Sequence, residues 1–453
     1  MAHDLVIRGG LIVDGTGAPG RTGDLAVSGG RIAEVGAVSG RGAREVDAGG
    51  LVVAPGFIDP HTHYDAQLTW DPSASCTSWH GVTTIVTGNC GFTLAPCRPV
   101  PSRLGTDHEL EYLAGAMGST GRGIVELTIG GSRPDRVAEV DRYMELARAA
   151  GRPVTMVSVR HNPVRPDEHR RILGKVEAAW REGLRLHPQG TCSPLTSTFT
   201  ITNGFVFGRY KAWRRVLEAK PSEWRAILAD PGFRAEFRES VRHTALFNGD
   251  VVPLRVKRVV KPELQHFAGK SVVELARETG KDVVDAFLDL TLADDFRTEF
   301  MSATMNTDAG AVAEIFMHPT AVLGLSDAGA HITQFSEAGQ TSQLLGHWVR
   351  ERQALTIEAA VRLVTSAPAE IFGIPDRGRL APGLAADITV FDPRTIACHE
   401  EEIVHDMPDG GPRYVARSSG IQWSFVNGQP IIHDGRLPEP EAVSNAGRVI
   451  RAA

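Results

Sequence analysis

The sequence lacks the features that mark several classes of protein. It has only five cysteines in 453 residues, without Cys-x-x-Cys spacing, which argues against a disulfide framework and a structural zinc knuckle. It contains no apolar run of about 18 residues, the length of a membrane span. Its first residues lack a positively charged segment followed by an apolar stretch. We therefore expect a cytoplasmic protein with no membrane partner.

An excess of positive charge is also missing. The 48 Lys and Arg residues face 54 Asp and Glu residues, for a net charge of −6, and no block of basic residues occurs. Nucleic-acid-binding proteins carry basic patches, so we expect no nucleic acid partner. With 42% hydrophobic and 23% charged residues, the chain has the composition of an ordinary globular protein.

Both ends of the chain carry short strand patterns separated by glycine. Residues 4–53 contain several such patterns and no helical one, and residues 386–392 and 422–432 alternate apolar and polar residues around an Asn-Gly turn. A short strand left alone keeps an unpaired edge, so the two ends are most simply joined. We predict a small β-sandwich domain formed by residues 1–52 and 376–453.

The middle of the chain, residues 53–375, alternates apolar strand patterns with helical patterns. This alternation is typical of βα units around a parallel sheet, and it indicates the α/β class. Helical patterns rich in Trp, Arg and Glu predict a helical insertion around residues 191–320. The strand patterns cover residues 51–58, 83–87, 123–129, 153–159, 184–187 and 322–326, and the helical ones residues 135–150, 167–182, 222–241, 272–279, 281–292 and 357–365.

The strongest motif is Pro-Gly-Phe-Ile-Asp-Pro-His-Thr-His-Tyr-Asp at residues 55–65. Side chains alternate between the faces of a strand, so His61 and His63 point the same way and can present two imidazoles to one metal ion. The alternative is that both are polar residues of a half-exposed strand. The apolar run that leads into them favours the metal site.

Two further strand ends carry candidate ligands. Cys90 follows the β-branched run of residues 81–87, and Asp327 follows the apolar run of residues 322–326. The carboxyl ends of parallel barrel strands form the active-site edge, where a thiolate can bind zinc and a carboxylate can bind metal and accept a proton. Alternatively, Cys90 is a small buried apolar residue and Asp327 belongs to a turn.

Together with the β-rich ends, these motifs resemble the amidohydrolase superfamily. The combination of residues 56–65 with residues 81–91 is similar to its D-aminoacylase branch, the N-acyl-D-amino-acid deacylases, and residues 380–390 and 426–428 are similar to strands of the family's small β domain. The resemblance implies a (β/α)8 TIM-type barrel. It also implies a hydrolase that cleaves a linear amide of a small-molecule substrate with one or two zinc ions.

The resemblance further implies roles for individual residues. His61 and His63 would bind the first metal, and Cys90 would take the place of the carbamylated lysine of many relatives. Asp327 would be the general base and a possible ligand, taking a proton from water and passing it to the leaving nitrogen.

The sequence departs from the branch in two respects. The two further histidine ligands that the branch supplies from middle strands, after Thr or Ser, are absent as motifs, which leaves His161 and His187 as candidates. Only about six barrel strands are readable, and residues 99–121 are too few for two βα units, so either the barrel lacks two units or the strand count is wrong.

The remaining site residues and alternatives stay open. The candidates for holding a substrate carboxylate are Arg160, Arg165 and His331. The same metal chemistry would serve a cyclic-amide hydrolase of the hydantoinase or dihydropyrimidinase kind, although the absent strand lysine argues against it. The missing histidines would also fit a catalytically silent barrel with a structural role. The sequence leaves the oligomeric state open, a homo-oligomer included.

Overall fold

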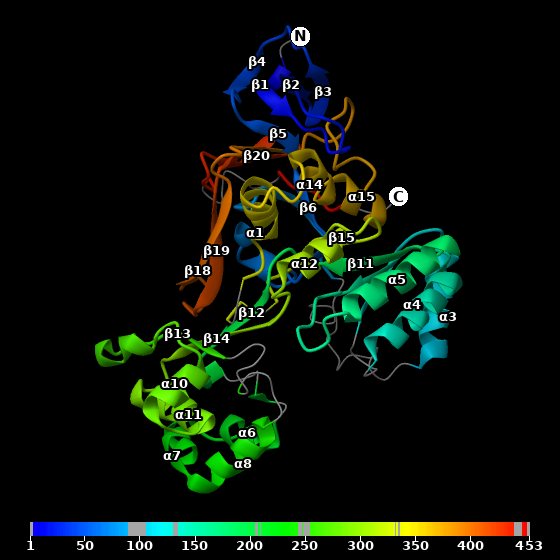
Figure 1. Cartoon of the computed structure of the whole chain (residues 1–453). Coiled ribbons are helices and arrows are strands. Elements are labelled where there is room, and N and C mark those ends of the chain that lie inside the picture. Colours follow the sequence, from blue (N-terminus) through cyan, green and yellow to red (C-terminus); the bar gives the residue numbers. More distant parts are fainter. Residues whose placement is uncertain are drawn as a thin grey trace.

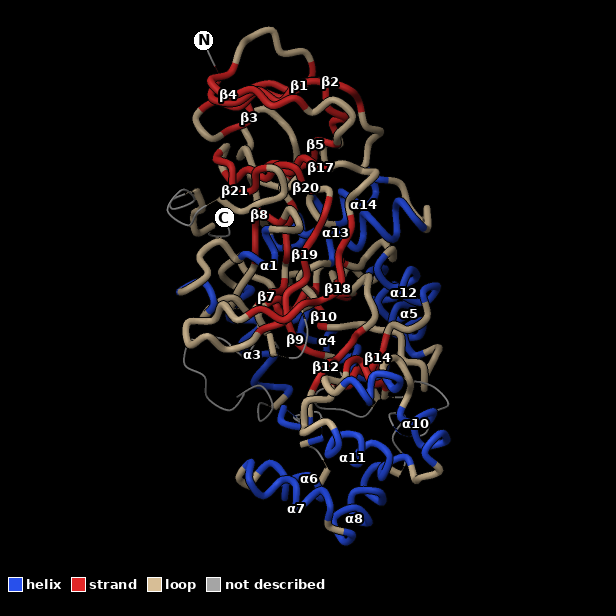
Figure 2. Tube along the Cα trace, turned by 90° about the vertical axis from the view of Figure 1, so that its left-hand side faces the viewer, coloured by secondary structure: helices blue, strands red, loops and turns tan. Residues whose placement is uncertain are grey.

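The computed structural model describes residues 3–88, 106–129, 135–203, 207–208, 210–242, 247, 254–330, 332–333, 336–438 and 446–450. A β-rich part at one end, an α/β part in the middle and a helical lobe at the other end follow one another along the molecule (Figure 1). The view turned by 90° shows the same order, with strands at one end and helices at the other (Figure 2). None of the helices in these ranges is long and apolar enough to cross a membrane.

The β-rich part is one eight-stranded sheet with strands from both ends of the chain. Strand β5 links the two ends, because it pairs in parallel with β1 and antiparallel with β17. Apolar side chains such as Ile7, Leu25 and Ile388 form its core. The strands are β1 (His3–Ile12), β2 (Arg21–Ser28), β3 (Arg31–Gly36), β4 (Gly42–Asp47), β5 (Val52–Pro55), β17 (Ile388–Phe391), β20 (Ile421–Val426) and β21 (Gln429–His433).

A separate antiparallel pair, β18 (Ala397–Val404) and β19 (Arg413–Ser419), extends from the β-rich part along the α/β part (Figure 1). On β19, the buried Arg413 forms ion pairs with Asp406 and Asp71. Because Asp71 lies in the α/β part of the chain, this contact ties the hairpin to the region that follows the His61 strand.

Parallel strands make up the α/β part. Four of them form one sheet in the order β15, β11, β10, β9, and the others form the parallel pairs β6–β8 and β7–β16. In the described part of the chain, no ladder joins β8 to β9. The strands are β6 (Phe57–Asp59), β7 (His61–Thr62), β8 (Val82–Ile85), β9 (Val125–Thr128), β10 (Val154–Val157), β11 (Leu186–Gly190), β15 (Val322–Leu323) and β16 (Leu325–Ala328).

The six predicted strand segments are confirmed to within a few residues, but two of them are interrupted. Gly56 separates β5 from β6, and Gly324 separates β15 from β16. Gly324 has φ +144°, and a Cβ at this position would clash with the ring of Pro60. Only glycine allows this backbone conformation and this close approach, which brings β16 alongside β7.

Helices cover the parallel sheet and complete its core. Asp135 caps α4 by accepting hydrogen bonds from the backbone N–H groups of Val137 and Ala138, and Gly151 ends the helix in the left-handed conformation. The helices of this part are η1 (Gln67–Thr69), α1 (Ser75–Ser78), α3 (Asp107–Gly118), α4 (Arg136–Ala150), α5 (Glu168–Arg181), α12 (Ala309–Phe316), α13 (Gln340–Gln343), the π-helical η6 (Leu344–Glu351), α14 (Ile357–Leu363) and α15 (Ser366–Phe372).

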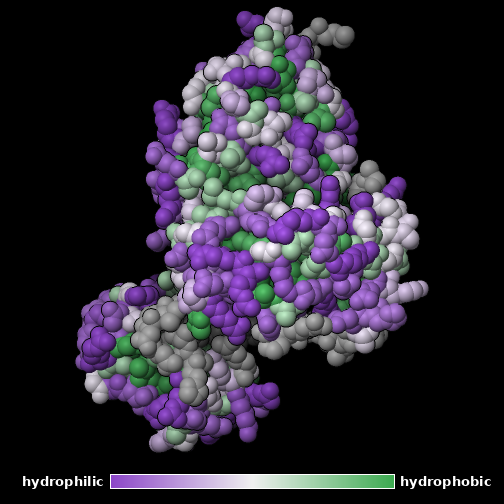
Figure 3. All heavy atoms as spheres, turned by 45° about the vertical axis from the view of Figure 1, so that its right-hand side comes forward, coloured by the Kyte–Doolittle hydropathy of each residue, from purple (hydrophilic) through white to green (hydrophobic). Residues whose placement is uncertain are grey.

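The helical lobe has a core of its own, in which Trp213, Phe237 and Phe287 are fully buried. It protrudes from the rest of the molecule (Figure 3). Its helices are η2 (Ile201–Asn203), α6 (Lys211–Leu217), η4 (Pro221–Glu223), α7 (Trp224–Ala229), α8 (Pro231–Val241), η5 (Pro262–Phe267), α10 (Val272–Thr279) and α11 (Val283–Ala293).

One expectation for this lobe is wrong, and another is incomplete. The single helix expected over residues 222–241 is two helices, because Pro231 cannot donate a backbone hydrogen bond and Asp230 instead caps a new helix at Phe233. The insertion is also not purely helical. It contains the antiparallel sheet β12 (Leu195–Phe199), β14 (Glu299–Met305) and β13 (Arg255–Arg258).

Candidate metal centre

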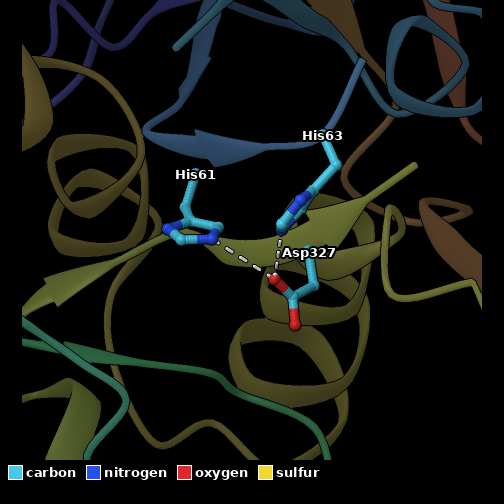
Figure 4. A group of neighbouring side chains, drawn as sticks. All are labelled: His61, His63 and Asp327. Atoms are coloured by element: carbon cyan, nitrogen blue, oxygen red, sulfur yellow. Dashed lines mark hydrogen bonds and ion pairs between the residues drawn. The ribbon is translucent and has the colours of Figure 1, made fainter. Parts of the chain in front are cut away.

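Three side chains from two neighbouring strands converge (Figure 4). His61 lies on β7, His63 follows directly after it, and Asp327 lies on β16, which pairs in parallel with β7. Asp327 Oδ1 is 3.3 Å from His61 Nε2 and 3.0 Å from His63 Nε2. The three ligand atoms lie within 4.8 Å of one another, so one metal ion could bind to all three.

The backbone of Asp327 directs its carboxylate towards the histidines. The register between β16 and β7 shifts between Leu325 and Ala328, as in a β-bulge, and Asp327 adopts φ +49°. This left-handed conformation is uncommon for residues other than glycine, and aspartate tolerates it better than most. Such backbone strain is characteristic of functional sites, where the surrounding structure holds a side chain in place.

The surroundings keep Asp327 ionised. Burial acts to raise the pKa of Asp327, but hydrogen bonds from His61 and His63 and their charges outweigh this effect and hold it well below its usual range. The neighbouring Asp59 behaves differently, since burial raises its pKa to about 7. Of these two carboxyl groups, Asp327 is therefore the more fully ionised and the better metal ligand.

Glu126, on β9, was not predicted as a site residue from the sequence. Its Oε1 lies 2.8 Å from His61 Nδ1, while its Oε2 accepts hydrogen bonds from Thr155 Oγ1 (2.8 Å) and from Gln189 Nε2. The side chain of Glu126 is only 7% exposed. An acidic residue within the strand pattern of residues 123–129 was the signal in the sequence that could have pointed to it.

The two middle-strand candidates lie elsewhere. His187 Nδ1 is 2.9 Å from the Thr320 carbonyl oxygen, its ring packs edge-on against Trp180, and burial lowers its pKa to about 4. His161 packs against His169 at 5.6 Å between ring centroids. Among the described residues, His61, His63 and Asp327 form the one group of three potential ligands, and it includes neither histidine.

The other candidates divide into three cases. Cys90 and His331 lie outside the described residues. Arg165 is more than half exposed and forms an ion pair with the buried Glu168. Arg160 is buried and pairs with the buried Glu337.

Arg160 and Glu337 form a buried pair with unused hydrogen-bonding capacity. Arg160 Nη2 is 3.8 Å from Glu337 Oε2, and both side chains are more than nine-tenths buried. Arg160 Nη1 and both carboxyl oxygens of Glu337 have no hydrogen-bond partner. Burial and the charges of Asp327 and Glu401 raise the pKa of Glu337 to about 8 against the opposing effect of Arg160. Buried polar groups without partners are costly, and a ligand could satisfy them.

The comparison with known families agrees with this geometry. The model of the amidohydrolase family matches residues 44–109 and 263–432, together just over half of the chain. The chain belongs to the amidohydrolase family. The matched ranges include His61, His63 and Asp327, so the converging residues of this amidohydrolase lie in the segments that define the family.

This amidohydrolase is similar to individual deacylases along almost its whole length. It is 28% identical to the N-acyl-D-glutamate deacylase of Alcaligenes xylosoxydans xylosoxydans, covering 99% of this chain and 96% of the relative. A solved D-aminoacylase, described as having a binuclear metal centre, matches with a TM-score of 0.66 at 21% identity over 97% of this chain and 98% of the other. The predicted membership of the D-aminoacylase branch is confirmed, as is an α/β fold of the amidohydrolase type.

A second solved structure shares this fold and contains a metal. It is the N-acyl-D-glutamate deacylase of Bordetella bronchiseptica, complexed with zinc and a phosphonate inhibitor that mimics the tetrahedral intermediate. Its TM-score is 0.60 at 24% identity, and the match covers 96% of this chain and 99% of that one.

Proposed function

We propose that this amidohydrolase removes the acyl group of N-acyl-D-amino acids by metal-dependent hydrolysis of a carbon–nitrogen bond that is not a peptide bond. The observation that carries the proposal is the convergence of His61, His63 and Asp327 at one edge of the parallel strands. The deacylase relatives, which align along almost the whole chain, support the reaction class.

The donor set suits zinc. Two imidazole nitrogens and one carboxylate oxygen are typical ligands of a catalytic zinc ion. Cys90 is proposed as a further ligand. When bound, the metal supplies Lewis-acid chemistry that makes water more acidic and polarises the amide carbonyl.

Asp327 is the residue proposed to move the proton. Its carboxylate is ionised and oriented by the two histidines, so it can accept a proton from the attacking water. It can then return that proton to the nitrogen of the departing amino acid. No covalent bond between enzyme and substrate is needed in this scheme.

Arg160 is proposed to hold the carboxylate of the substrate, with His331 as a second candidate for contacting it. Arg160 is buried, its Nη1 has no hydrogen-bond partner, and it belongs to the loop that follows β10. A guanidinium group binds a carboxylate through charge-assisted hydrogen bonds. The position of Arg160 would thus select substrates whose amino acid carries a free carboxylate.

A substrate panel tests the proposal. We expect kcat/KM for N-acetyl-D-glutamate, N-acetyl-D-aspartate or N-acetyl-D-leucine to exceed that for the L-enantiomers and for hydantoin and dihydroorotate by about 100-fold, a difference that a few contacts in a fixed pocket can provide. The assay uses zinc-loaded protein. It measures released amino acid for the N-acyl substrates and ring opening to the N-carbamoyl amino acid for the cyclic amides. A preference for the cyclic amides would instead favour the cyclic-amide hydrolase.

The Arg160–Glu337 pair predicts a pH dependence of substrate binding. Below a pH of about 8, Glu337 is uncharged and leaves the charge of Arg160 available, whereas above it the ionised Glu337 competes for Arg160. Besides Arg160 and Asp327, the charge of Glu401 acts on Glu337, and Glu401 itself forms an ion pair with Lys257. We expect KM for N-acyl-D-amino acids to rise about tenfold above this pH, a change of about 1.4 kcal/mol.

Two controls isolate this effect. Glu337→Gln should abolish the rise in KM, and a substrate whose carboxylate is replaced by an amide should not show it. A rise in KM that is equal in the wild-type protein and in Glu337→Gln would contradict the assignment.

We also propose the domain division expected from the sequence. Residues 1–52 and 376–453 would form the β-sandwich domain, and the shared eight-stranded sheet supports the joining of the two chain ends. Residues 53–375 would form the TIM-type barrel, with the helical lobe as an insertion around residues 191–320. The barrel would lack two βα units, because the interval between β8 and β9 is short for them.

A further inference from the structure

We propose that Glu126 is a positioning residue of a single-metal centre, where its carboxylate fixes the orientation and the tautomer of His61. The proposal deepens the proposed function, on which it depends only in requiring that a metal ion binds at His61, His63 and Asp327. Nothing in the motifs assigns a role to Glu126, which lies 65 residues after His61.

His61 contacts a carboxylate through each of its two ring nitrogens. Its Nδ1 lies 2.8 Å from Glu126 Oε1, and its Nε2 lies 3.3 Å from Asp327 Oδ1. A carboxylate accepts hydrogen bonds, so it places the proton of a neutral imidazole on Nδ1 and leaves the lone pair on Nε2, the atom that faces the other ligands. A carboxylate bound to the outer nitrogen of a metal-ligating histidine also raises the basicity of that ligand.

The carboxylate of Glu126 is itself held in place by hydrogen bonds. Thr155 and Gln189, on the adjacent strands β10 and β11, both donate to its Oε2. Both are fully buried, and Thr155 pairs with Glu126 in the parallel ladder. Three donors from three elements therefore fix the carboxylate, and a residue held in this way can hold His61 in turn.

The side chains of the middle strands also bear on how many metal ions the site can hold. The middle strands were expected to supply two histidine ligands, but the side chains that converge there are Glu126, Thr155 and Gln189. They bind one another and His61, so both oxygens of Glu126 are already used within the protein. We infer that these strands support the ligands of one ion and do not build a site for a second one.

The variant Glu126→Gln tests the role of the charge with little change in shape. The Oε1 of Gln189 is buried without a hydrogen-bond partner, so rotating the Gln189 amide would let it accept from the new amide group. We expect zinc affinity, measured by competition with a chelator, to fall about 10- to 100-fold, as for other outer partners of ligating histidines. The absorption spectrum of the cobalt-substituted protein should also change.

Glu314→Gln is the matched control, because it removes a carboxylate that binds another histidine, His169, away from the metal ligands. Its zinc affinity and cobalt spectrum should equal those of the wild type. Should Glu126→Gln fail to fold, Thr155→Val, which removes one donor to Glu126 and keeps the side-chain shape, should still weaken zinc binding severalfold.

The outcomes are distinct. Unchanged zinc affinity and an unchanged cobalt spectrum in Glu126→Gln, or in Thr155→Val if the first variant does not fold, would overturn the role of Glu126. Two tightly bound ions per chain in the wild type would overturn the single-metal centre. Since none of these measurements uses a substrate, weakened metal binding without deacylase activity would refute the proposed function and leave this inference intact.

Discussion

Asp327→Asn is expected to lower the kcat of amide hydrolysis by about a thousandfold, within the range that a general acid–base group contributes. The asparagine side chain has nearly the same shape but cannot accept the proton of the attacking water, and it removes the negative charge that lies 3.0 Å from His63 Nε2 and 3.3 Å from His61 Nε2. Initial rates of amino-acid release by zinc-loaded protein measure the effect.

Asp141→Asn is a suitable control for this experiment, since Asp141 is an exposed aspartate on α4 that pairs with Lys175. It should retain wild-type activity. The metal content of each variant, measured alongside, separates the loss of a base from the loss of a ligand. Equal rates for Asp327→Asn and the wild type would refute the proposed role of Asp327.

Removal of the metal is expected to have the other large effect. Chelation should abolish hydrolysis, and one equivalent of zinc per chain should restore it, because His61, His63 and Asp327 are the ligand group among the described residues. Binding to the folded state also stabilises it, by about 4 kcal/mol when free zinc is a thousandfold above Kd. The melting temperature should therefore rise when zinc is added back.

The same preparation tests the alternative of a catalytically silent barrel. Elemental analysis of the purified protein should find about one tightly held metal ion per chain, as for other sites in which ligand deprotonation and folding are linked to binding. A metal content well below one, together with a melting temperature that does not respond to zinc, would favour a structural role instead.

Much of the candidate centre could be predicted from local patterns. Alternation along a strand places His61 and His63 on the same side, and an apolar run places Asp327 at a strand end. These rules act over a few residues, so they apply without knowledge of the fold. The strand segments were predictable for the same reason, whereas the break at Pro231 depended on proline chemistry that the helical periodicity concealed.

Glu126 could not be assigned in this way. An acidic side chain within residues 123–129 is equally compatible with an exposed strand face. The partners of Glu126 also lie on other strands, and Gln189 is 63 residues away in the sequence. The antiparallel sheet of the lobe was not predicted for a similar reason. Phe199 pairs with Phe300, about a hundred residues later in the chain, and local strand propensity does not indicate which distant segments pair.

The sequence by itself therefore determined the types of ligand, the strand ends that carry them and the family to which they belong, because these depend on short-range alternation and on spacing. The tertiary structure alone decided which groups meet. It placed Asp327 against the two histidines, Glu126 behind His61 and Glu337 beside Arg160, and it left His161 and His187 out of the ligand group. The physical reason is that these contacts join residues far apart in the chain, and strand order and register bring them together.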